Sequence, residues 1–334
     1  MPRQISVTTV LTCQNGACDV AAPFRLGLVG AGRMGRTHMR ALADSSEVAI
    51  TAIAEPSPQS RSALTGDGFS VHASFAEMLA NTSPDAVLVA APTDQHLSII
   101  SELAPSGLPI LCEKPCGLTS QQALKAAEIA AAAGVRMQVA YWRRYVPALI
   151  ALRHRIQGGE LGDLHLVACY QWDEAPPSPL FRAHSGGIAI DMGVHEFDQI
   201  RWLTGQDIGA LSAAAGPVSA DAGITGDVDS AQVLATLSGG TAGFVSLGRH
   251  HPRGDMARAE VFGTGGFERC DFLDPADGER AQLEALRRQA EEFARYARGA
   301  DCSGATAADA VAALRAAEQV TAAIPAISGS GLPG

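Results

Sequence analysis

The feature that most constrains the fold of this chain is a glycine-rich segment directly after its first apolar run. Phe24 to Val29 has the length and composition of a buried strand, and residues 30–35 (GAGRMG) follow it and open a helical stretch. In a G-x-G-x-x-G turn the first glycine allows the tight turn, the second lets a pyrophosphate approach the backbone, and the third lets helix and strand pack closely. The residues expected to form this phosphate site are Gly30, Gly32, Arg33, Met34 and Gly35.

An acidic residue at the end of the second expected strand strengthens this interpretation. Glu55 lies twenty residues beyond Gly35. A carboxylate at that position accepts hydrogen bonds from the adenosine ribose hydroxyls of a dinucleotide, and it repels a 2′-phosphate. The sequence therefore predicts NAD as the cofactor in preference to NADP. Arg61, on the helix that follows, is either a solvated residue or a contact for a 2′-phosphate, so NADP stays an open alternative.

Short apolar runs alternate with helical stretches over residues 24–140, which is typical of a parallel sheet with crossover helices. The expected fold class is α/β, with an N-terminal Rossmann domain built on a doubly wound parallel sheet. The expected strands are Phe24 to Val29, Val48 to Ala54, Phe69 to His72, Asp85 to Ala90, Pro109 to Cys112 and Arg136 to Ala140. The expected helices are Arg33 to Asp44, Phe75 to Ala80, Asp94 to Leu103 and Ser120 to Ala132.

The pattern changes after Tyr141, where strand-like runs follow one another and Gly239-Gly240 marks a hairpin turn. This predicts a C-terminal α+β domain with a largely antiparallel open sheet. Its expected strands are Leu164 to Trp172, Val228 to Leu237, Thr241 to Gly248 and Ala257 to Phe262, with a proline-rich loop through Pro176, Pro177 and Pro179 and helices up to Arg155 and at Asp191 to Leu203, Arg280 to Arg298 and Thr306 to Ala323. We expect an N-terminal extension (1–23), an NAD(P)-binding domain (24–140) and a substrate-binding and oligomerisation domain (141–334).

Composition excludes several classes of partner. A formal net charge of −10 disfavours nucleic acids and anionic membrane surfaces. The apolar stretches are interrupted well short of a membrane span, and residues 1–23 lack the basic start and apolar core of a secretory signal. We therefore expect a cytoplasmic protein. The seven cysteines are odd in number and scattered, without the spacing of a metal site, so we expect reduced thiols and no metal.

Three further segments carry a specific resemblance. They are residues 85–96 (DAVLVAAPTDQH), 113–115 (EKP) and 185–195 (SGGIAIDMGVH). Together with the glycine fingerprint, and in this order, they resemble the glucose–fructose oxidoreductase, inositol dehydrogenase and rhizopine catabolism family (Gfo/Idh/MocA) from Phe24 to about Ala323. The resemblance implies a two-domain NAD(P) enzyme acting on sugars, cyclitols or related polyols, joined as a homodimer or homotetramer through the C-terminal sheet. It also implies a cis Lys114–Pro115 peptide bond.

The chemistry of alcohol oxidation points to three residues in these segments. Oxidation of a secondary alcohol needs a base within hydrogen-bond reach of the hydroxyl, and His195 is the candidate. Asp191 lies four residues earlier on an expected helix, so both side chains share a face. Lys114 lies at the carboxyl end of a strand, where open α/β sheets bind ligands, and its ammonium can stabilise alkoxide character. By resemblance, Lys114, Asp191 and His195 match the family's catalytic residues.

Other residues are expected to shape the site. Thr93, His96 and Glu113 follow the fourth and fifth strands and are expected at the cofactor, although a packing role is equally open for His96. Trp142 would give the substrate pocket an aromatic wall. Arg143 and the arginine after it either bind an acidic substrate or form ion pairs at the domain junction.

The family pattern is not complete. Asp255 falls where several inositol and sugar dehydrogenases carry a substrate-contacting tyrosine, which leaves the substrate open, and Arg249, His250 and His251 are nearby candidates to compensate. Asp198 is expected to support its helix, and His38 and His72 to be structural.

The predicted function is NAD-dependent oxidation of a secondary hydroxyl of a sugar, an inositol-like cyclitol or a related polyol, by hydride transfer to the nicotinamide. One alternative is an NADP-dependent reductase of a keto-sugar or imine, because the reaction is reversible. The other is a catalytically idle NAD(P)-sensing regulator on the same fold, since fold alone does not establish chemistry. Retention of Lys114, Asp191 and His195 favours an enzyme.

Overall fold

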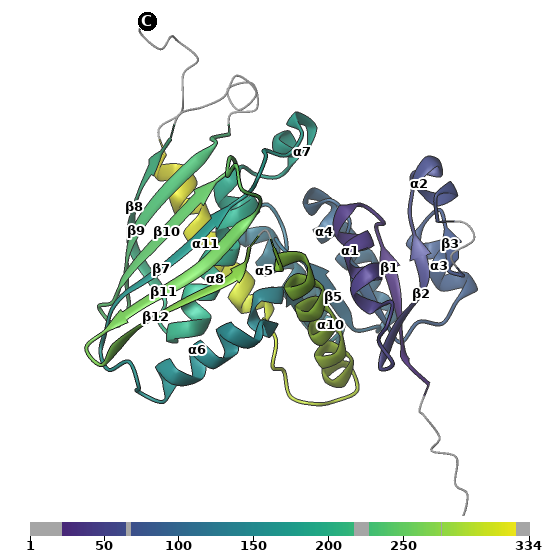
Figure 1. Cartoon of the computed structure of the whole chain (residues 1–334). Coiled ribbons are helices and arrows are strands. Elements are labelled where there is room, and N and C mark those ends of the chain that lie inside the picture. The colour runs from purple at the N-terminus through teal and green to yellow at the C-terminus, as the bar shows by residue number, and fades with distance from the viewer. Residues whose placement is uncertain (1–21, 65–67, 217–226, 275, 325–334) are drawn as a thin grey trace, which may run out of the picture.

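The computed structural model describes residues 22–64, 68–216, 227–274 and 276–324, which form two six-stranded sheets with helices between and around them (Figure 1). The first sheet is parallel throughout, with strand order β3-β2-β1-β4-β5-β6. Its strands are β1 (Phe24–Val29), β2 (Val48–Ala54), β3 (Ser70–His72), β4 (Ala86–Val89), β5 (Ile110–Glu113) and β6 (Met137–Ala140). The predicted Rossmann-type sheet is thereby confirmed.

Burial explains why these strands read as continuous apolar runs. Every residue of β4, β5 and β6 is buried, as expected for parallel strands that are covered by helices on both faces. The strand order reverses between β1 and β4, and the carboxyl ends of strands at such a switch point form a ligand crevice. The glycine turn after β1 and the segment after β4 both lie at that crevice.

Helices connect the parallel strands and carry side-chain caps where the sequence provides them. They are α1 (Arg33–Leu42), α2 (Pro58–Ser62), α3 (Phe75–Asn81), α4 (His96–Leu103) and α5 (Ser120–Ala132), with 3₁₀ turns at Thr93–Gln95 and Ala104–Ser106. The hydroxyls of Ser57, Ser74 and Thr119 accept from backbone N–H groups of the first turns of α2, α3 and α5. The start of α1 has no such cap, since Gly32 precedes it.

The second sheet has strand order β12-β11-β7-β10-β9-β8 and is antiparallel except for the β10–β7 pair. Its strands are β7 (Leu164–Trp172), β8 (Ile208–Ala215), β9 (Ser230–Leu237), β10 (Ala242–Gly248), β11 (Met256–Gly263) and β12 (Gly266–Leu273). The predicted hairpin at Gly239-Gly240 joins β9 to β10, and Gly240 adopts φ +87° there.

Three elements of this half were not expected from the sequence. Strand β8 is rich in alanine and lacks the β-branched pattern that marks a strand, and β12 contains three charged residues and no β-branched residue. Residues expected in the proline-rich loop form the short helix α7 (Pro179–His184), whose first residue is a proline and whose cap is Ser178.

The remaining helices pack the two sheets together. They are α6 (Pro147–Gln157), α8 (Val194–Thr204), α10 (Gly278–Ala297) and α11 (Ala307–Ala323), with a 3₁₀ turn at Trp142–Tyr145 and a π-helical turn at Ala189–Gly193. Figure 1 shows α10 between the two sheets, and its Ala290, Phe293 and Ala294 are buried in a core cluster with residues of β1 and β2. Helix α11 packs on α5 and on α8. C-terminal helices thus cover elements of the N-terminal half.

Several expectations concern the ends of the chain and its thiols. The expected extension (1–23), apart from residues 22 and 23, lies outside the described residues. Among the described residues, Cys112, Cys116, Cys169, Cys270 and Cys302 are free thiols. No helix within the described ranges is long and apolar enough to cross a membrane.

Candidate active site

The glycine turn has the geometry that a dinucleotide requires. Gly30 adopts φ +95°, and a Cβ there would lie 2.8 Å from the carbonyl oxygen of Ala90. A Cβ at Gly35 would overlap the carbonyl oxygen of Gly30, whereas a Cβ at Gly32 would meet nothing within 4 Å. Gly30 and Gly35 therefore hold strand and helix together, and Gly32 faces open space at the N-terminus of α1. This is the cradle that a pyrophosphate fits, because free N–H groups and the helix dipole attract phosphate there.

The acidic residue after β2 is held beside this turn. Glu55 is 8% exposed, and its Oε2 accepts from the backbone N–H of Ala31 at 2.8 Å, while Oε1 accepts from that of Ser57 at 2.9 Å. Arg61 donates to the carbonyl oxygens of Glu55 and Pro56 at 2.8 and 2.7 Å. The carboxylate is thus fixed at the edge of the glycine turn, and the guanidinium of Arg61 is bonded to the main chain behind it.

The segment after β4 lies beside the glycine turn, where a Cβ at Gly30 would meet the backbone of Ala90 and Ala91. Thr93 is half-buried at the start of a 3₁₀ turn, and His96 begins α4. The imidazole of His96 is 1% exposed and lies between two carbonyl oxygens, with Nδ1 at 2.8 Å from that of Pro115 and Nε2 at 2.8 Å from that of Ala91. Burial lowers the pKa of His96. The ring links the ends of β4 and β5, and its expected contact with a cofactor stays a prediction.

Glu113 ends β5 and lies inside the protein. Its carboxylate is 4% exposed; Oε1 lies 2.6 Å from Nε2 of His38, and Oε2 accepts from the backbone N–H of Lys114 at 3.0 Å. His38 on α1 was expected to be structural, and its imidazole contacts the carboxylate of Glu113. A cofactor contact of Glu113 stays a prediction. The Lys114–Pro115 peptide bond is cis, as the resemblance implied.

Lys114 and Asp191 meet across the two halves of the chain. The Nζ of Lys114 donates to the carbonyl oxygen of Asp191 at 2.8 Å and lies 3.8 Å from Oδ1 of the same residue. The second carboxylate oxygen of Asp191 lies 3.3 Å from Nη1 of Arg249. The carboxylate of Asp191 is thus placed between two cations, and the Lys114 and Asp191 side chains keep 16% and 13% of their surface exposed.

His195 lies in the first turn of α8, which continues the π-helical turn that holds Asp191. Its imidazole packs edge-on against Tyr141 and Trp142, with ring centroids 6.0 and 6.3 Å away. Burial, followed by the positive charges of Lys114 and Arg143, lowers the pKa of His195 well below its usual range. At neutral pH the ring is therefore uncharged, which is the form a general base requires.

The residues that join the halves are more enclosed than the sequence alone indicates. Trp142 is 4% exposed, and its ring packs between those of His195 and Phe272. Arg143 forms a buried ion pair with Glu196 and also donates to Gln199 at 3.3 Å. In the structure Arg143 therefore has the ion-pair role that the sequence left open. Contact of Trp142 or Arg143 with a substrate stays a prediction.

The next arginine, Arg144, is also paired. Its Nε donates to Asp198 at 2.9 Å, and its Nη2 lies 3.3 Å from Asp309 on α11. Asp198 is buried, and desolvation raises its pKa against the opposing effect of Arg144. Asp198 therefore fixes α8 to the domain junction, which agrees with its expected supporting role.

A buried ion network beside Asp191 was largely missed from the sequence. Arg249 has a fully buried side chain, and its Nη2 lies 3.1 Å from Oδ2 of Asp227. Asp227 also pairs with Arg182 of α7 at 3.0 Å, and Arg182 reaches Asp229 at 2.8 Å. From the sequence, Arg249 was named only as a candidate to compensate for the tyrosine that Asp255 replaces. No spacing rule links residues 182, 191, 227 and 249, because the sheet topology alone brings them together.

Two more acidic residues lie near this network. The pKa of Asp173, at the end of β7, is raised by burial and by the neighbouring carboxylates of Asp255 and Asp191. Asp255 accepts from the backbone N–H of Glu174 at 2.7 Å. Asp255 therefore orders the loop after β7, and Asp173 is a further carboxyl beside Asp191 that the sequence analysis did not name.

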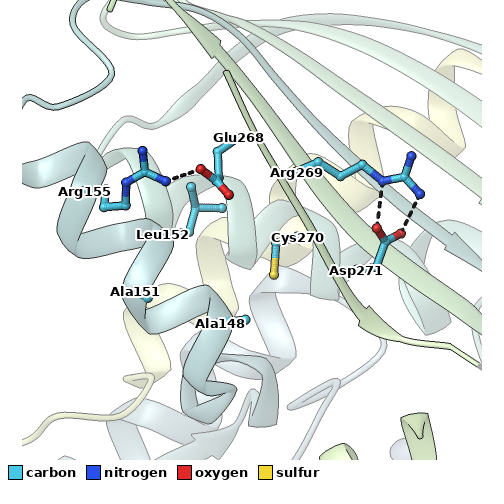
Figure 2. A pocket seen from close by; sticks show the side chains of 8 residues that line it. All are labelled: Ala148, Ala151, Leu152, Arg155, Glu268, Arg269, Cys270 and Asp271. Atoms are coloured by element: carbon cyan, nitrogen blue, oxygen red, sulfur yellow. Dashed lines mark hydrogen bonds and ion pairs between the residues drawn. The ribbon is translucent and has the colours of Figure 1, made fainter. Parts of the chain in front are cut away.

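A separate pocket of about 310 Å³ lies between α6 and β12 (Figure 2). Figure 2 shows the ion pairs Arg155–Glu268 and Arg269–Asp271 at its sides, with Cys270 between them. Its lining contains none of the residues expected in the active site. In the described part of the chain, no group of three or more His, Cys, Asp or Glu side chains has a metal-binding arrangement.

Comparisons with known proteins agree with this geometry. A family model described as "Oxidoreductase family, NAD-binding Rossmann fold" matches residues 24–141, and a GFO/IDH/MocA C-terminal domain model matches residues 149–267. Rhizopine catabolism protein MocA of Rhizobium meliloti is 51% identical over 298 residues, covering 89% of this chain and 94% of that protein. Inositol 2-dehydrogenase of the same species is 29% identical, covering 79% and 80%. A myo-inositol dehydrogenase crystal structure from Corynebacterium glutamicum aligns with a TM-score of 0.81 at 26% identity, over 90% of this chain and 96% of that one.

Proposed function

The chain belongs to the Gfo/Idh/MocA family of oxidoreductases with an NAD-binding Rossmann fold, and from this premise we propose that it oxidises a secondary hydroxyl of a cyclitol or sugar-like polyol. The observation that carries the proposal is the meeting of Lys114 with Asp191, one residue from each half of the chain, beside an uncharged His195. A lysine, a carboxylate and a neutral imidazole are the groups that alcohol oxidation needs.

The glycine turn and Glu55 would hold the dinucleotide. Gly30, Gly32, Arg33, Met34 and Gly35 would contact the pyrophosphate, and Glu55 the adenosine ribose, with Thr93 at the nicotinamide end. When bound, NAD supplies the acceptor for the hydride that leaves the substrate carbon. The carboxylate of Glu55 favours NAD over NADP, and Arg61 bonds the main chain behind that carboxylate.

The protein's own residues would divide the remaining chemistry among them. His195 takes the hydroxyl proton onto its imidazole, which the low pKa keeps unprotonated before the reaction. Lys114 donates a hydrogen bond to the same oxygen and stabilises the negative charge that develops on it. Asp191 accepts from Lys114 and from a substrate hydroxyl, and Trp142 closes the wall of the pocket beside His195.

The names of the relatives narrow the proposed substrate. The 51% identical relative is a rhizopine catabolism protein, and the other relative reported above is an inositol 2-dehydrogenase. We therefore place inositols and their substituted derivatives first among the candidates. Asp173 and Asp191 add two partly exposed carboxyl groups on this side of Lys114, and such groups suit a substrate rich in hydroxyls.

A substrate panel tests the proposal. Purified protein is incubated with NAD or NADP and with inositols, aldoses, uronates or glycosides, and formation of the reduced cofactor is measured. We expect NAD reduction with at least one cyclitol and weaker reduction with NADP. Reduction of a keto-sugar or imine with NADPH, without any alcohol oxidation, would favour the reductase. Tight NAD binding with no turnover on any compound would favour the idle regulator.

The exposed face of the second sheet supports the proposed homo-oligomer. Leu234, Phe262 and Phe267 are exposed by 56%, 39% and 51% on strands β9, β11 and β12, and the rings of Phe262 and Phe267 are in contact, with their centroids 4.5 Å apart. Exposed apolar side chains on one sheet are typical of a subunit interface. Replacing Leu234 by Glu should shift the protein toward monomer in light scattering, and an unchanged mass would contradict this interface.

A further inference from the structure

We propose that His38 and Glu113 are positioning residues that fix Lys114 from behind, through a hydrogen-bond path that starts on α1. The path runs from the imidazole of His38 to the carboxylate of Glu113 and from there to the backbone N–H of Lys114. It ties the helix that carries the phosphate cradle to the lysine at the reacting oxygen. The inference rests on the proposed function where it assigns Lys114 to catalysis.

The contact between His38 and Glu113 is short and buried. Nε2 of His38 lies 2.6 Å from Oε1 of Glu113, and the two side chains are 0% and 4% exposed. A carboxylate removed from water in this way is stable only when donors replace the lost hydration. His38 is the donor to Oε1, so its removal leaves a buried oxygen without that partner.

The other oxygen of Glu113 acts directly on Lys114. Oε2 accepts from the backbone N–H of Lys114 at 3.0 Å, at the point where β5 ends. The side chain of Lys114 then leaves in the direction of Asp191, whose carbonyl oxygen its Nζ reaches at 2.8 Å. A carboxylate anchored on one side by His38 therefore sets the main chain from which the catalytic ammonium projects.

The geometry of His38 also defines a conservative replacement. Nε2 contacts Glu113, whereas Nδ1 is buried without a hydrogen-bond partner among the described residues. Glutamine places an amide N–H at the distance of Nε2 from the backbone, whereas the amide of asparagine reaches only the position of Nδ1. His38→Gln should therefore keep the contact and His38→Asn should lose it.

The sequence offers a direct probe of Lys114. The chain contains only two lysines, Lys114 and Lys125. Lys125 lies on α5, is 60% exposed and pairs only loosely with Glu128 at 3.3 Å, so it serves as an internal reference. Amine acetylation, followed by peptide mass spectrometry, gives the ratio of Lys114 to Lys125 labelling rates, and this ratio needs neither a substrate nor turnover.

Loss of the path should free Lys114. In His38→Asn the labelling ratio should rise by about fivefold, the change in a local opening equilibrium expected when one hydrogen bond is lost. In His38→Gln the ratio should stay close to that of the wild type. Glu113→Met, which keeps the length of the side chain but removes both acceptor oxygens, should behave like His38→Asn, and the double variant should add little because both changes break one path.

A second measurement separates positioning from general packing. With myo-inositol and NAD as the probe pair, kcat of His38→Asn should fall by about 10- to 100-fold, since small misplacement of a catalytic group has costs of this size. The dissociation constant for NAD should change little. His72→Asn is the matched control, because His72, on β3, is also a buried histidine but contacts Ser70.

The possible results are distinct. A His38→Asn protein with lower thermal stability but an unchanged labelling ratio would overturn the inference, because His38 would then only fill space. The same rise in ratio in His72→Asn would also overturn it. If the wild type oxidises none of the cyclitols of the panel, the proposed substrate class fails, but the labelling ratios still decide whether His38 and Glu113 fix Lys114.

Discussion

Lys114 donates a hydrogen bond from its Nζ to the carbonyl oxygen of Asp191 over 2.8 Å, although 77 residues separate them in the sequence. Lys114 follows the end of β5 in the parallel sheet, and Asp191 lies in the π-helical turn before α8, which packs on the second sheet. The contact therefore joins the two halves of the chain at the proposed reaction centre. An ammonium has three donors, so the carbonyl oxygen leaves donors for the Asp191 carboxylate and a substrate oxygen.

Cofactor preference should depend on Glu55. The wild type should bind NAD more tightly than NADP, because the Glu55 carboxylate, buried beside the glycine turn, repels a 2′-phosphate. Glu55→Ser should narrow the ratio of the two dissociation constants by about tenfold, which corresponds to about 1.4 kcal/mol. Fluorescence titration with both cofactors measures the ratio. Equal affinities of the wild type for NAD and NADP would contradict this prediction.

Arg249 should contribute strongly to the stability of the fold, although it lies outside the sequence motifs. Arg249→Met removes one partner from a buried network with Asp191 and Asp227, and such a loss typically costs about 3–5 kcal/mol of stability. Arg249→Lys keeps the charge and should be milder. Chemical denaturation measures the change. Arg253→Met, on an exposed turn, is the control and should stay within about 0.5 kcal/mol of the wild type.

Arg249 also bears on catalysis. Once folded, Arg249→Lys should lower kcat while leaving NAD affinity unchanged, because the guanidinium orients the Asp191 carboxylate and makes no contact with the glycine turn. A Lys variant with full stability and full kcat would show that the network is dispensable.

Acid sensitivity should report the burial of His195. Burial and the charges of Lys114 and Arg143 hold its pKa well below the usual value, so below about pH 6.5 the unfolded chain binds a proton that the folded protein does not. The free energy of unfolding therefore falls as the pH decreases below about 6.5, by at most about 1.4 kcal/mol per pH unit from this group. Above about pH 6.5 this group causes no loss of stability. His195→Gln should flatten this slope in urea melts between about pH 5 and 7.

His96 also contributes to the acid sensitivity of the wild type and of the variant. Burial lowers its pKa as well, so it contributes a slope of the same sign in the wild type and in the variant. His195→Gln should therefore reduce the acid slope without abolishing it. An identical slope in the two proteins would mean that His195 does not titrate abnormally.

Local sequence signals predicted the first half of the fold well. The glycine turn, the apolar runs of β1, β4 and β5, and the capping residues of α5 each act over a few neighbouring residues, so their physical cause is visible in the sequence. The alanine-rich β8 carried no such signal, because its place at the edge of the second sheet comes from pairing with β9 and not from its own propensity.

The site divides in the same way. Lys114, Asp191 and His195 stood out because they lie in motifs with a family order. The residues that hold them did not stand out in the sequence, because Arg249 meets Asp191, and His38 meets Glu113, only through tertiary packing. Their burial also could not be predicted: an arginine after a strand is usually solvated, whereas the Arg249 side chain has no exposed surface.

The measurement that tests the account most directly is the steady-state rate of NADH formation by His195→Ala. General-base catalysis typically contributes about 10²- to 10⁴-fold, so kcat should fall within that range on the best substrate of the panel while the NAD dissociation constant stays nearly unchanged. Lys114→Ala should behave similarly and Asp191→Asn more mildly. The wild-type rate should rise with pH along a limb that is absent in His195→Ala. Near-wild-type turnover with an unchanged pH profile in His195→Ala would contradict the account and would make Lys114 or a bound water the base.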